Sequence, residues 1–249
     1  MRQVVVLSGK GGTGKTSVAA SLAHLASRQY KLTLVDADVD ASNLELLLKP
    51  KRVAQHEFMG MDVAVIDDEK CTGHGDCERV CRFQAVQAFQ ENGRKAYAIE
   101  TIACEGCASC FYQCPEKAIK MIPRKAGEWY QSDTGYGPLF HAHLFAGQPN
   151  SGKLVTLVKE QARQKMLGSG SSLMLVDGPP GIGCPVIATL SGADLAILVV
   201  EPTLSGIHDL ERIMETVRHF GVKPQVVINK ADLNTKRSEE IMLYCQAQD

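Results

Sequence analysis

The most specific chemical signal in the chain is the run Ser8-Gly9-Lys10-Gly11-Gly12-Thr13-Gly14-Lys15-Thr16. It follows an apolar run at 4–7 and precedes a segment whose apolar residues recur at helical spacing, so a strand, a glycine-rich turn and a helix come in succession. Glycines let backbone N–H groups surround a phosphate, and the helix N-terminus adds partial positive charge. The run is therefore typical of a phosphate-binding loop.

Within this loop, Lys15 can reach the β- and γ-phosphates of a nucleotide, and the Thr16 hydroxyl can ligate Mg²⁺. A second lysine, Lys10, stands at the start of the loop, where a solvated side chain is the alternative to a role in chemistry. We expect the nucleotide to be bound by Gly9, Gly11, Gly12, Thr13, Gly14, Lys15, Thr16 and Ser17.

A second chemical signal comes from the cysteines, of which the chain has nine, seven of them between Cys71 and Cys114. This clustering favours a metal site in a reducing compartment over a secreted disulfide framework. The downstream half, Cys104-x-x-Cys107-x-x-Cys110-x-x-x-Cys114-Pro115, is the bacterial ferredoxin run. The upstream half repeats its spacing as Cys71-x-x-His74-x-x-Cys77-x-x-x-Cys81, with histidine in the second position.

In ferredoxin runs the fourth cysteine ligates the other cluster. Crossed ligation predicts one 4Fe–4S site made by Cys81, Cys104, Cys107 and Cys110, and a second site made by Cys71, His74, Cys77 and Cys114. Three outcomes at His74 stay open: imidazole ligation of an ordinary cluster, a three-iron cluster, or a site that is empty or holds zinc. Zinc in one half is the structural rival to a cluster.

The rest of the chain alternates near-continuous apolar strands with helical patterns. Such alternation predicts an α/β fold with a mostly parallel sheet covered by helices on both faces. The composition changes abruptly between 63 and 123, so we expect an inserted small α+β, ferredoxin-like domain there and a discontinuous main domain at 1–62 and 124–249. The expected strands are 4–7, 32–36, 173–177, 196–200 and 225–229, and a helix is expected at 207–220.

The pattern Lys-Gly-Gly-x-Gly-Lys-Thr resembles the deviant Walker A motif of the MinD/ParA/nitrogenase-iron-protein class of P-loop ATPases. With the insert, the chain resembles members of that superfamily that contain a ferredoxin domain, and it is similar to Mrp-type ATPases. The resemblance implies a homodimer in which Lys10 reaches the nucleotide of the facing subunit, together with a further strand and helix after Asp249.

The same resemblance implies roles for acidic residues that follow predicted strands. Asp36 would act indirectly on Mg²⁺, Asp38 would position the attacking water, and Asp177, in a segment resembling switch II, would hold Mg²⁺ through a water. Asp40 competes with Asp38, and the alternative is that one or two of these acids cap a helix that begins near Asn43.

A base-recognition loop is expected at Asn229-Lys230-Ala231-Asp232, which follows the last predicted strand. Its sequence fits the guanine-recognition motif of GTPases, in which Asp232 would contact the base. In the resembling class, an asparagine at the place of Asn229 contacts adenine. The deviant loop favours ATP, and GTP is not excluded.

Three functions fit these motifs. The first is a dimerising ATPase that assembles or delivers metal–sulfur clusters to an apo metalloprotein, the second is an ATP-gated electron donor to a redox partner, and the third is a ParA/MinD-like positioning protein with structural clusters. We favour the first. The net charge of −1 without a basic stripe predicts neither a nucleic-acid nor a membrane partner. Because no signal peptide precedes the first strand, a cytoplasmic location is expected.

Three further residues are ambiguous. Cys184 lies seven residues after Asp177, the spacing of the cysteine that bridges a cluster in the nitrogenase iron protein, but we expect a buried or half-buried thiol. His141 and His143 alternate on an expected strand, where a metal pair and a solvated strand face are the two interpretations. We expect the solvated face.

Overall fold

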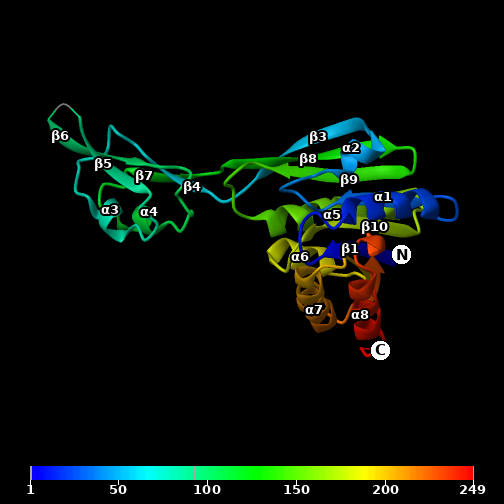
Figure 1. Cartoon of the computed structure of the whole chain (residues 1–249). Helices are drawn as coiled ribbons and strands as arrows, with labels where there is room; N and C mark the ends of the chain where they lie inside the picture. The colour runs from blue at the N-terminus through cyan, green and yellow to red at the C-terminus, as the bar shows by residue number, and fades with distance from the viewer. Residues whose placement is uncertain (1, 92, 249) are drawn as a thin grey trace. The chain divides into compact units, whose positions relative to one another are not determined.

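Residues 2–91 and 93–248 are described by a computed structural model, drawn in Figure 1. The chain forms two units. The first, which we call the sheet unit, comprises Met1–His56, Glu128–Leu144 and Ser151–Asp249, and the second, the cysteine unit, comprises Glu57–Gly127 and Phe145–Asn150. The predicted insert at 63–123 lies inside the cysteine unit, which also takes in residues on both sides of it and the separate segment 145–150.

Eight strands form the central sheet of the sheet unit, in the order β12-β11-β1-β10-β2-β9-β8-β3. The neighbours from β12 to β9 pair in parallel. β8 and β9 are joined only by Gly135 and Tyr136, and so short a link permits only an antiparallel pair. The strands are β1 (Arg2–Ser8), β2 (Leu32–Asp36), β3 (Lys51–Met59), β8 (Lys125–Thr134), β9 (Gly137–Leu144), β10 (Leu173–Pro180), β11 (Leu195–Val200) and β12 (Lys223–Ile228).

This sheet confirms the predicted α/β class and each of the five predicted strands. Strand β10 is longer than predicted and continues to Pro180, through the segment that resembles switch II. β3 was not predicted, because in this strand only Phe58 is buried and no apolar run marks it.

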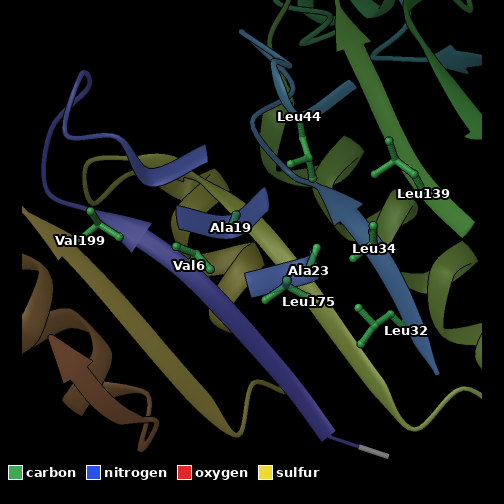
Figure 2. Packing of buried hydrophobic residues seen from close by; sticks show 9 residues of the cluster. All are labelled: Val6, Ala19, Ala23, Leu32, Leu34, Leu44, Leu139, Leu175 and Val199. Atoms are coloured by element: carbon green, nitrogen blue, oxygen red, sulfur yellow. The ribbon is translucent and has the colours of Figure 1, made fainter. Parts of the chain in front are cut away.

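Helices cover both faces of the sheet. On one face α1 and α2 contribute Ala19, Ala23 and Leu44 to a cluster with residues such as Val6 and Leu34 (Figure 2). Because side chains alternate along a strand, the equally buried Val5, Val35 and Val176 face the other side, where α5 and α6 contact the sheet. The helices are α1 (Lys15–Ala26), α2 (Leu44–Leu48), α5 (Ser151–Ser169), α6 (Cys184–Leu190), α7 (Leu204–His219), η1 (Ala231–Leu233) and α8 (Thr235–Gln246).

The cysteine unit consists of two similar halves. Strand β4 pairs antiparallel with β7, and β5 pairs antiparallel with β6. The core contains Ala64, Cys77, Val86, Tyr97 and Ile119, against which five further cysteines pack. The elements are β4 (Val63–Ile66), α3 (Asp76–Val80), β5 (Val86–Glu91), β6 (Arg94–Ile99), α4 (Ser109–Gln113) and β7 (Ile119–Ile122).

Backbone conformation repeats between these halves in step with the cysteine spacing. The residue before each short helix is left-handed, with φ of 84° at Gly75 and 60° at Ala108. After each half, the fourth cysteine accepts a backbone hydrogen bond at 3.3 Å, Cys81 from Ala85 and Cys114 from Ala118. The predicted sequence repeat is therefore also a repeat of backbone structure.

None of the helices in the described ranges combines the length and apolarity that crossing a bilayer requires.

Removing a buried side chain from the sheet should destabilise the sheet unit. Leu34 is fully buried, so Leu34→Ala should lower the free energy of unfolding by about 3 kcal/mol through lost burial and the cavity left behind. Trp129, the only tryptophan, lies on β8, so its fluorescence during urea denaturation reports on this unit. The control is Leu46→Ala, at a side chain 67% exposed, with an expected change below about 0.5 kcal/mol. Equal losses in the two variants would contradict the assigned core.

Candidate functional site

The glycine-rich loop connects the end of β1 to the start of α1 and is closely packed at two glycines. A Cβ atom on Gly9 would lie 2.5 Å from the backbone oxygen of Asp209 on α7. Gly14 adopts a φ of 88°, and a Cβ atom there would collide with the Asn229 side chain. Both positions therefore require glycine, which fixes the course of the loop. Of the other expected nucleotide-binding residues, Gly11, Gly12 and Ser17 are exposed, Thr16 is half-buried and Thr13 is buried.

Lys15 and two aspartates meet at the carboxyl edge of the sheet. Lys15 Nζ lies 2.9 Å from Asp177 Oδ1 and 3.9 Å from Asp38 Oδ2. Asp36 stands beside Asp177 because these residues pair across β2 and β10. The loop and the ends of two strands thus bring Lys15, Asp36, Asp38 and Asp177 together, whereas Asp40 is exposed.

This edge has oxygen atoms available for a hydrated cation. Asp177 Oδ2 is buried at this edge and has no hydrogen-bond partner among the described residues. Buried polar atoms are otherwise paired in most proteins, so this oxygen points to a group that binds here. Carboxylate and hydroxyl oxygens suit Mg²⁺, which keeps several of its waters when bound. Asp177, Asp36 and the Thr16 hydroxyl are the residues that would hold it.

The Asp36 carboxylate binds hydrogen-bond donors at and just before the start of α2. Its carboxylate accepts hydrogen bonds from the Ser42 hydroxyl at 2.7 Å, from the Leu44 N–H at 3.0 Å and from the Asp38 N–H at 3.1 Å. The expected helix near Asn43 is confirmed, and Asp36 satisfies its first N–H group, as the alternative interpretation of these acids suggested.

Burial changes the charge state of this edge. Burial, aided by the nearby charge of Asp177, raises the pKa of Asp36 to about 7. Burial also raises the pKa of Asp38, against the opposing effect of the Lys15 charge. A cation bound here would oppose both shifts.

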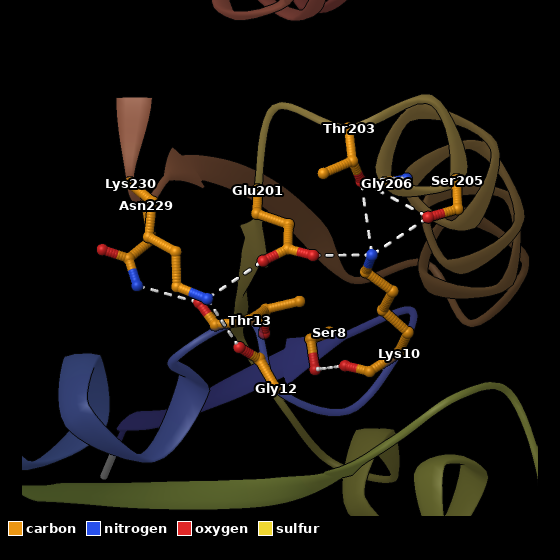
Figure 3. A network of polar contacts seen from close by, with 10 residues as sticks. All are labelled: Ser8, Lys10, Gly12, Thr13, Glu201, Thr203, Ser205, Gly206, Asn229 and Lys230. Carbon is orange, nitrogen blue, oxygen red and sulfur yellow. Dashed lines mark hydrogen bonds and ion pairs between the residues drawn. The ribbon is translucent and has the colours of Figure 1, made fainter. Parts of the chain in front are cut away.

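Lys10 is held by its own chain in a polar network that Figure 3 shows. Its Nζ lies 2.6 Å from a Glu201 carboxylate oxygen and donates to Ser205 at 3.0 Å and to Thr203 at 3.2 Å. The hydrogen bonds from Lys10 and Lys230 keep the pKa of Glu201 below its usual range. Sequence reasoning missed Glu201, although its place directly after the apolar run at 196–200 was a usable signal.

The residues expected to recognise the base differ in their contacts with the phosphate-binding loop. Asn229 donates from Nδ2 to the Thr13 carbonyl at 2.8 Å, so it contacts the phosphate-binding loop directly. Lys230 donates to the Gly12 carbonyl at 3.0 Å and also pairs with Glu201. Asp232 is exposed on η1. The structure thus brings Asn229, but not Asp232, into contact with the loop in the described chain.

The cysteines line two cavities in the cysteine unit. One cavity is lined by Cys81, Cys104, Cys107 and Cys110. The other is lined by Cys71, His74, Cys77 and Cys114. Each cavity thus gathers three residues of one half and the fourth cysteine of the other.

His74 lies at the rim of the second cavity and is half exposed. Its Nδ1 is 2.8 Å from the Thr72 hydroxyl, and its Nε2 is 3.7 Å from a Glu116 carboxylate oxygen. Because Thr72 occupies Nδ1, Nε2 is the nitrogen that can bind a metal. In the first cavity, hydrogen bonds from Ser109 lower the pKa of Cys107, which favours the thiolate that ligates metals.

Two expectations are wrong. Cys184 is exposed at the first position of α6, since its backbone begins the helix and its side chain projects from the first turn, so it is not a buried thiol. His141 is only 1% exposed, because its face of β9 packs under α2, so a solvated strand face describes His143 alone.

The fold and the loop define a P-loop nucleotide-binding protein. Residues 4–247 match the family described as CobQ/CobB/MinD/ParA nucleotide binding domain, and the chain belongs to this family. An uncharacterized protein of Methanocaldococcus jannaschii is 37% identical over 232 residues, which cover 93% of this chain and 79% of that protein. The septum site-determining protein MinD of Neisseria meningitidis is 31% identical over 121 residues, covering 42% of this chain and 45% of MinD.

Among solved structures, cobyrinic acid a,c-diamide synthase from Mycobacterium smegmatis, with a bound ATP analog and magnesium, matches with a TM-score of 0.55. The match covers all of this chain and 83% of that chain at 15% sequence identity, so it supports the fold alone.

Replacing Asp36 should change how stability depends on pH in the nucleotide-free protein. Its folded pKa of about 7 lies above the ordinary 3.8, so between these values the folded chain holds a proton that the unfolded chain has released. The free energy of unfolding of the wild type therefore falls as pH rises through this interval. Asp36→Asn lacks this contribution and should gain stability relative to the wild type, by on the order of 1 to 4 kcal/mol from pH 4 to pH 7.

The measurement is urea denaturation, followed by Trp129 fluorescence at a series of pH values. Asp40→Asn is the matched control, since Asp40 is exposed and its stability curve should run parallel to that of the wild type. If the Asp36→Asn curve also runs parallel, the raised pKa is wrong.

Proposed function

We propose that this chain is a Mg²⁺-dependent ATPase that dimerises across its nucleotides and carries iron–sulfur clusters, acting in the assembly or delivery of metal–sulfur clusters to an apo metalloprotein. The observation that carries the ATPase assignment is the meeting of Lys15, Asp38 and Asp177 at the phosphate-binding loop. Membership of the nucleotide-binding family supports it.

Each residue at this edge has a distinct task in hydrolysis. Lys15, which pairs with Asp177 Oδ1, would neutralise the β- and γ-phosphates, and Asp177 would hold the Mg²⁺ through a water bound to its unpartnered Oδ2. Asp38, partly buried and close to Lys15, orients the water that attacks in line with the γ-phosphate. Mg²⁺ supplies charge neutralisation for the phosphates when it is bound.

Lys10 acts on the nucleotide of the facing subunit. In the single chain its ammonium group is bound by Glu201, Thr203 and Ser205, all from its own chain. Dimerisation exchanges these contacts for the phosphates of the partner's nucleotide, where a positive charge stabilises the transition state. The Glu201 contact therefore keeps Lys10 away from the chemistry until two chains meet.

The two cysteine-lined cavities support the cluster-binding part of the proposal. Each gathers four ligand-type side chains at ferredoxin spacing, and soft thiolates suit iron–sulfur clusters. The left-handed residues before α3 and α4 turn the backbone around each cavity. We assign a 4Fe–4S cluster to the first cavity, and a 4Fe–4S or 3Fe–4S cluster to the second, with His74 in a ligand position.

Lys15→Ala and Lys10→Ala should each lower the rate of ATP hydrolysis at least about a thousandfold, because each removes a cation that stabilises the transferring phosphoryl group. Iron content should not change in either variant. Lys165→Ala, at an exposed position on α5, is the control and should hydrolyse ATP at the wild-type rate.

Mixing inactive variants tests whether Lys10 acts across the dimer. A mixed dimer of Lys10→Ala and Asp38→Ala chains contains one site with Asp38 in its own chain and Lys10 from the partner, so mixing should restore part of the activity. No recovery, in a mixture shown to form mixed dimers, would mean that Lys10 acts within its own chain.

Single cysteine replacements test the crossed pairing in anaerobically purified protein. Cys81→Ala should remove the same cluster signal as Cys104→Ala, and Cys114→Ala the same signal as Cys71→Ala, because the members of each pair line one cavity. The measurements are iron and sulfide content and electron paramagnetic resonance after reduction. Cys184→Ala is the control, with unchanged iron content. Loss of the Cys71-dependent signal in Cys81→Ala would overturn the crossed assignment.

Two other functions remain candidates, each with its own observation. The paired clusters equally suit an ATP-gated electron donor, which keeps its iron and changes redox state in each cycle, whereas a carrier loses iron to an apo acceptor. The sequence similarity to MinD favours a positioning ATPase with structural clusters. That protein would retain its iron and show no redox cycle under ATP turnover.

A further inference from the structure

A separate group of ligand-type side chains lies in the sheet unit, where the proposed function does not use it. Glu45 lies in the first turn of α2, and His141 and His143 share one face of β9, since they are two residues apart. Glu45 Oε2 is 3.2 Å from His141 Nδ1, and Glu45 Oε1 is 3.2 Å from His143 Nε2. Ligand atoms of all three residues lie within 4.8 Å of one another.

A second observation points to a group bound between these side chains. His141 is 1% exposed, and its Nδ1 makes no hydrogen bond of acceptable geometry within the described chain, although the Glu45 carboxylate is close. Its other nitrogen, Nε2, lies 3.0 Å from the Ser132 hydroxyl on β8. When Nε2–H donates to Ser132, Nδ1 carries a lone pair that faces a carboxylate oxygen of Glu45. This lone pair and the carboxylate oxygen repel each other, and a cation bound between the two atoms removes that repulsion.

We propose that Glu45, His141 and His143 bind a divalent transition-metal ion, for which Zn²⁺ is the best fit. Two imidazoles and one carboxylate form a zinc donor set, and bonds of about 2.0–2.1 Å place tetrahedral ligand atoms about 3.3 Å apart. Each imidazole lies 3.2 Å from a different oxygen of the Glu45 carboxylate, so both oxygens face the site, and one ligand atom from each residue lies within 4.8 Å of the others. Ser132 supplies the outer hydrogen bond that orients a zinc-ligating histidine.

The three residues leave the fourth zinc position to water or to an external ligand. The His143 side chain is 40% exposed, so solvent reaches the site from that side. The ion joins α2 to β9 and fixes Glu45, the neighbour of Leu44, whose N–H group Asp36 binds. Metal binding at this site therefore restrains the segment between Asp36 and α2.

The test compares Zn²⁺ and Co²⁺ binding by the wild-type chain and by Glu45→Gln and His143→Ala, with His208→Ala as the control at an exposed histidine. Each site variant should bind one Zn²⁺ fewer per chain, or bind it at least about 100-fold more weakly. The Co²⁺-loaded variants should lose the visible d–d absorption that belongs to this site, but keep the d–d and thiolate-to-cobalt absorption of any Co²⁺ bound by the cysteine unit. Glu45→Gln preserves side-chain shape, so it keeps the test decisive should His143→Ala fail to fold.

X-ray absorption at the zinc edge gives an independent readout, since nitrogen and oxygen ligands lie at about 2.0–2.1 Å and sulfur ligands at about 2.3 Å. The wild type should show a nitrogen/oxygen shell that the site variants lose and His208→Ala keeps. Identical stoichiometry, affinity and spectra in wild type and site variants would overturn the proposal. Because no nucleotide or iron is needed, this outcome is independent of the proposed ATPase.

Discussion

Two buried carboxylates at the carboxyl edge of the sheet need a neighbouring positive charge, and this need constrains the rest of the sheet unit. Parallel pairing of β2 and β10 places Asp36 and Asp177 side by side, both almost fully buried. Two buried carboxylates repel each other, and Lys15 provides the neighbouring positive charge. The glycine-rich loop must therefore follow the course that its tight packing fixes at Gly9 and Gly14, because that course brings Lys15 to this edge.

The cysteine unit follows a different constraint, set by backbone geometry. Each half needs a residue in the left-handed region directly before its short helix, and glycine occupies this place in one half and alanine in the other. A non-glycine residue in this region is uncommon and strained. The recurrence of this conformation at Ala108 therefore indicates that the turn around each cavity is required, and that it does not arise from glycine alone.

Sequence reasoning predicted the parts of the fold that depend on short-range patterns. The strands 32–36 and 196–200 are continuous apolar runs, and the phosphate-binding loop has a fixed spacing, so both could be read directly. The boundaries of the cysteine unit and the exposed strand β3 lack such a signal. Contacts between segments far apart in the sequence could not be predicted either. Lys159, for example, donates hydrogen bonds to the carbonyls of Thr189 and Ser191, and burial lowers its pKa to about 7.

At the site, residue types were predictable and their contacts were not. The residue types alone could not show that Asn229 contacts the phosphate-binding loop while Asp232 faces solvent, because this difference depends on how β12 ends. Nor could they place Glu45 beside His141, since α2 and β9 are far apart in the sequence. Asp36 and Asp177 show the same limit. Their positions at strand ends predicted the edge of the sheet at which they lie, but not which neighbouring groups each carboxylate would bind.

The hydrogen bonds of the two buried aspartates differ, and this difference bears on the part that each would play in the proposed Mg²⁺ site. A carboxylate offers about four lone-pair directions, and Asp36 uses three of them for Ser42, Leu44 and the Asp38 N–H group. It has one direction left, which suits a water bound to the metal better than the metal itself. Asp177 keeps a whole oxygen without a partner in the described chain. In the proposed Mg²⁺ site, Asp177 would therefore be the main protein carboxylate, and Asp36 would connect the site to the start of α2.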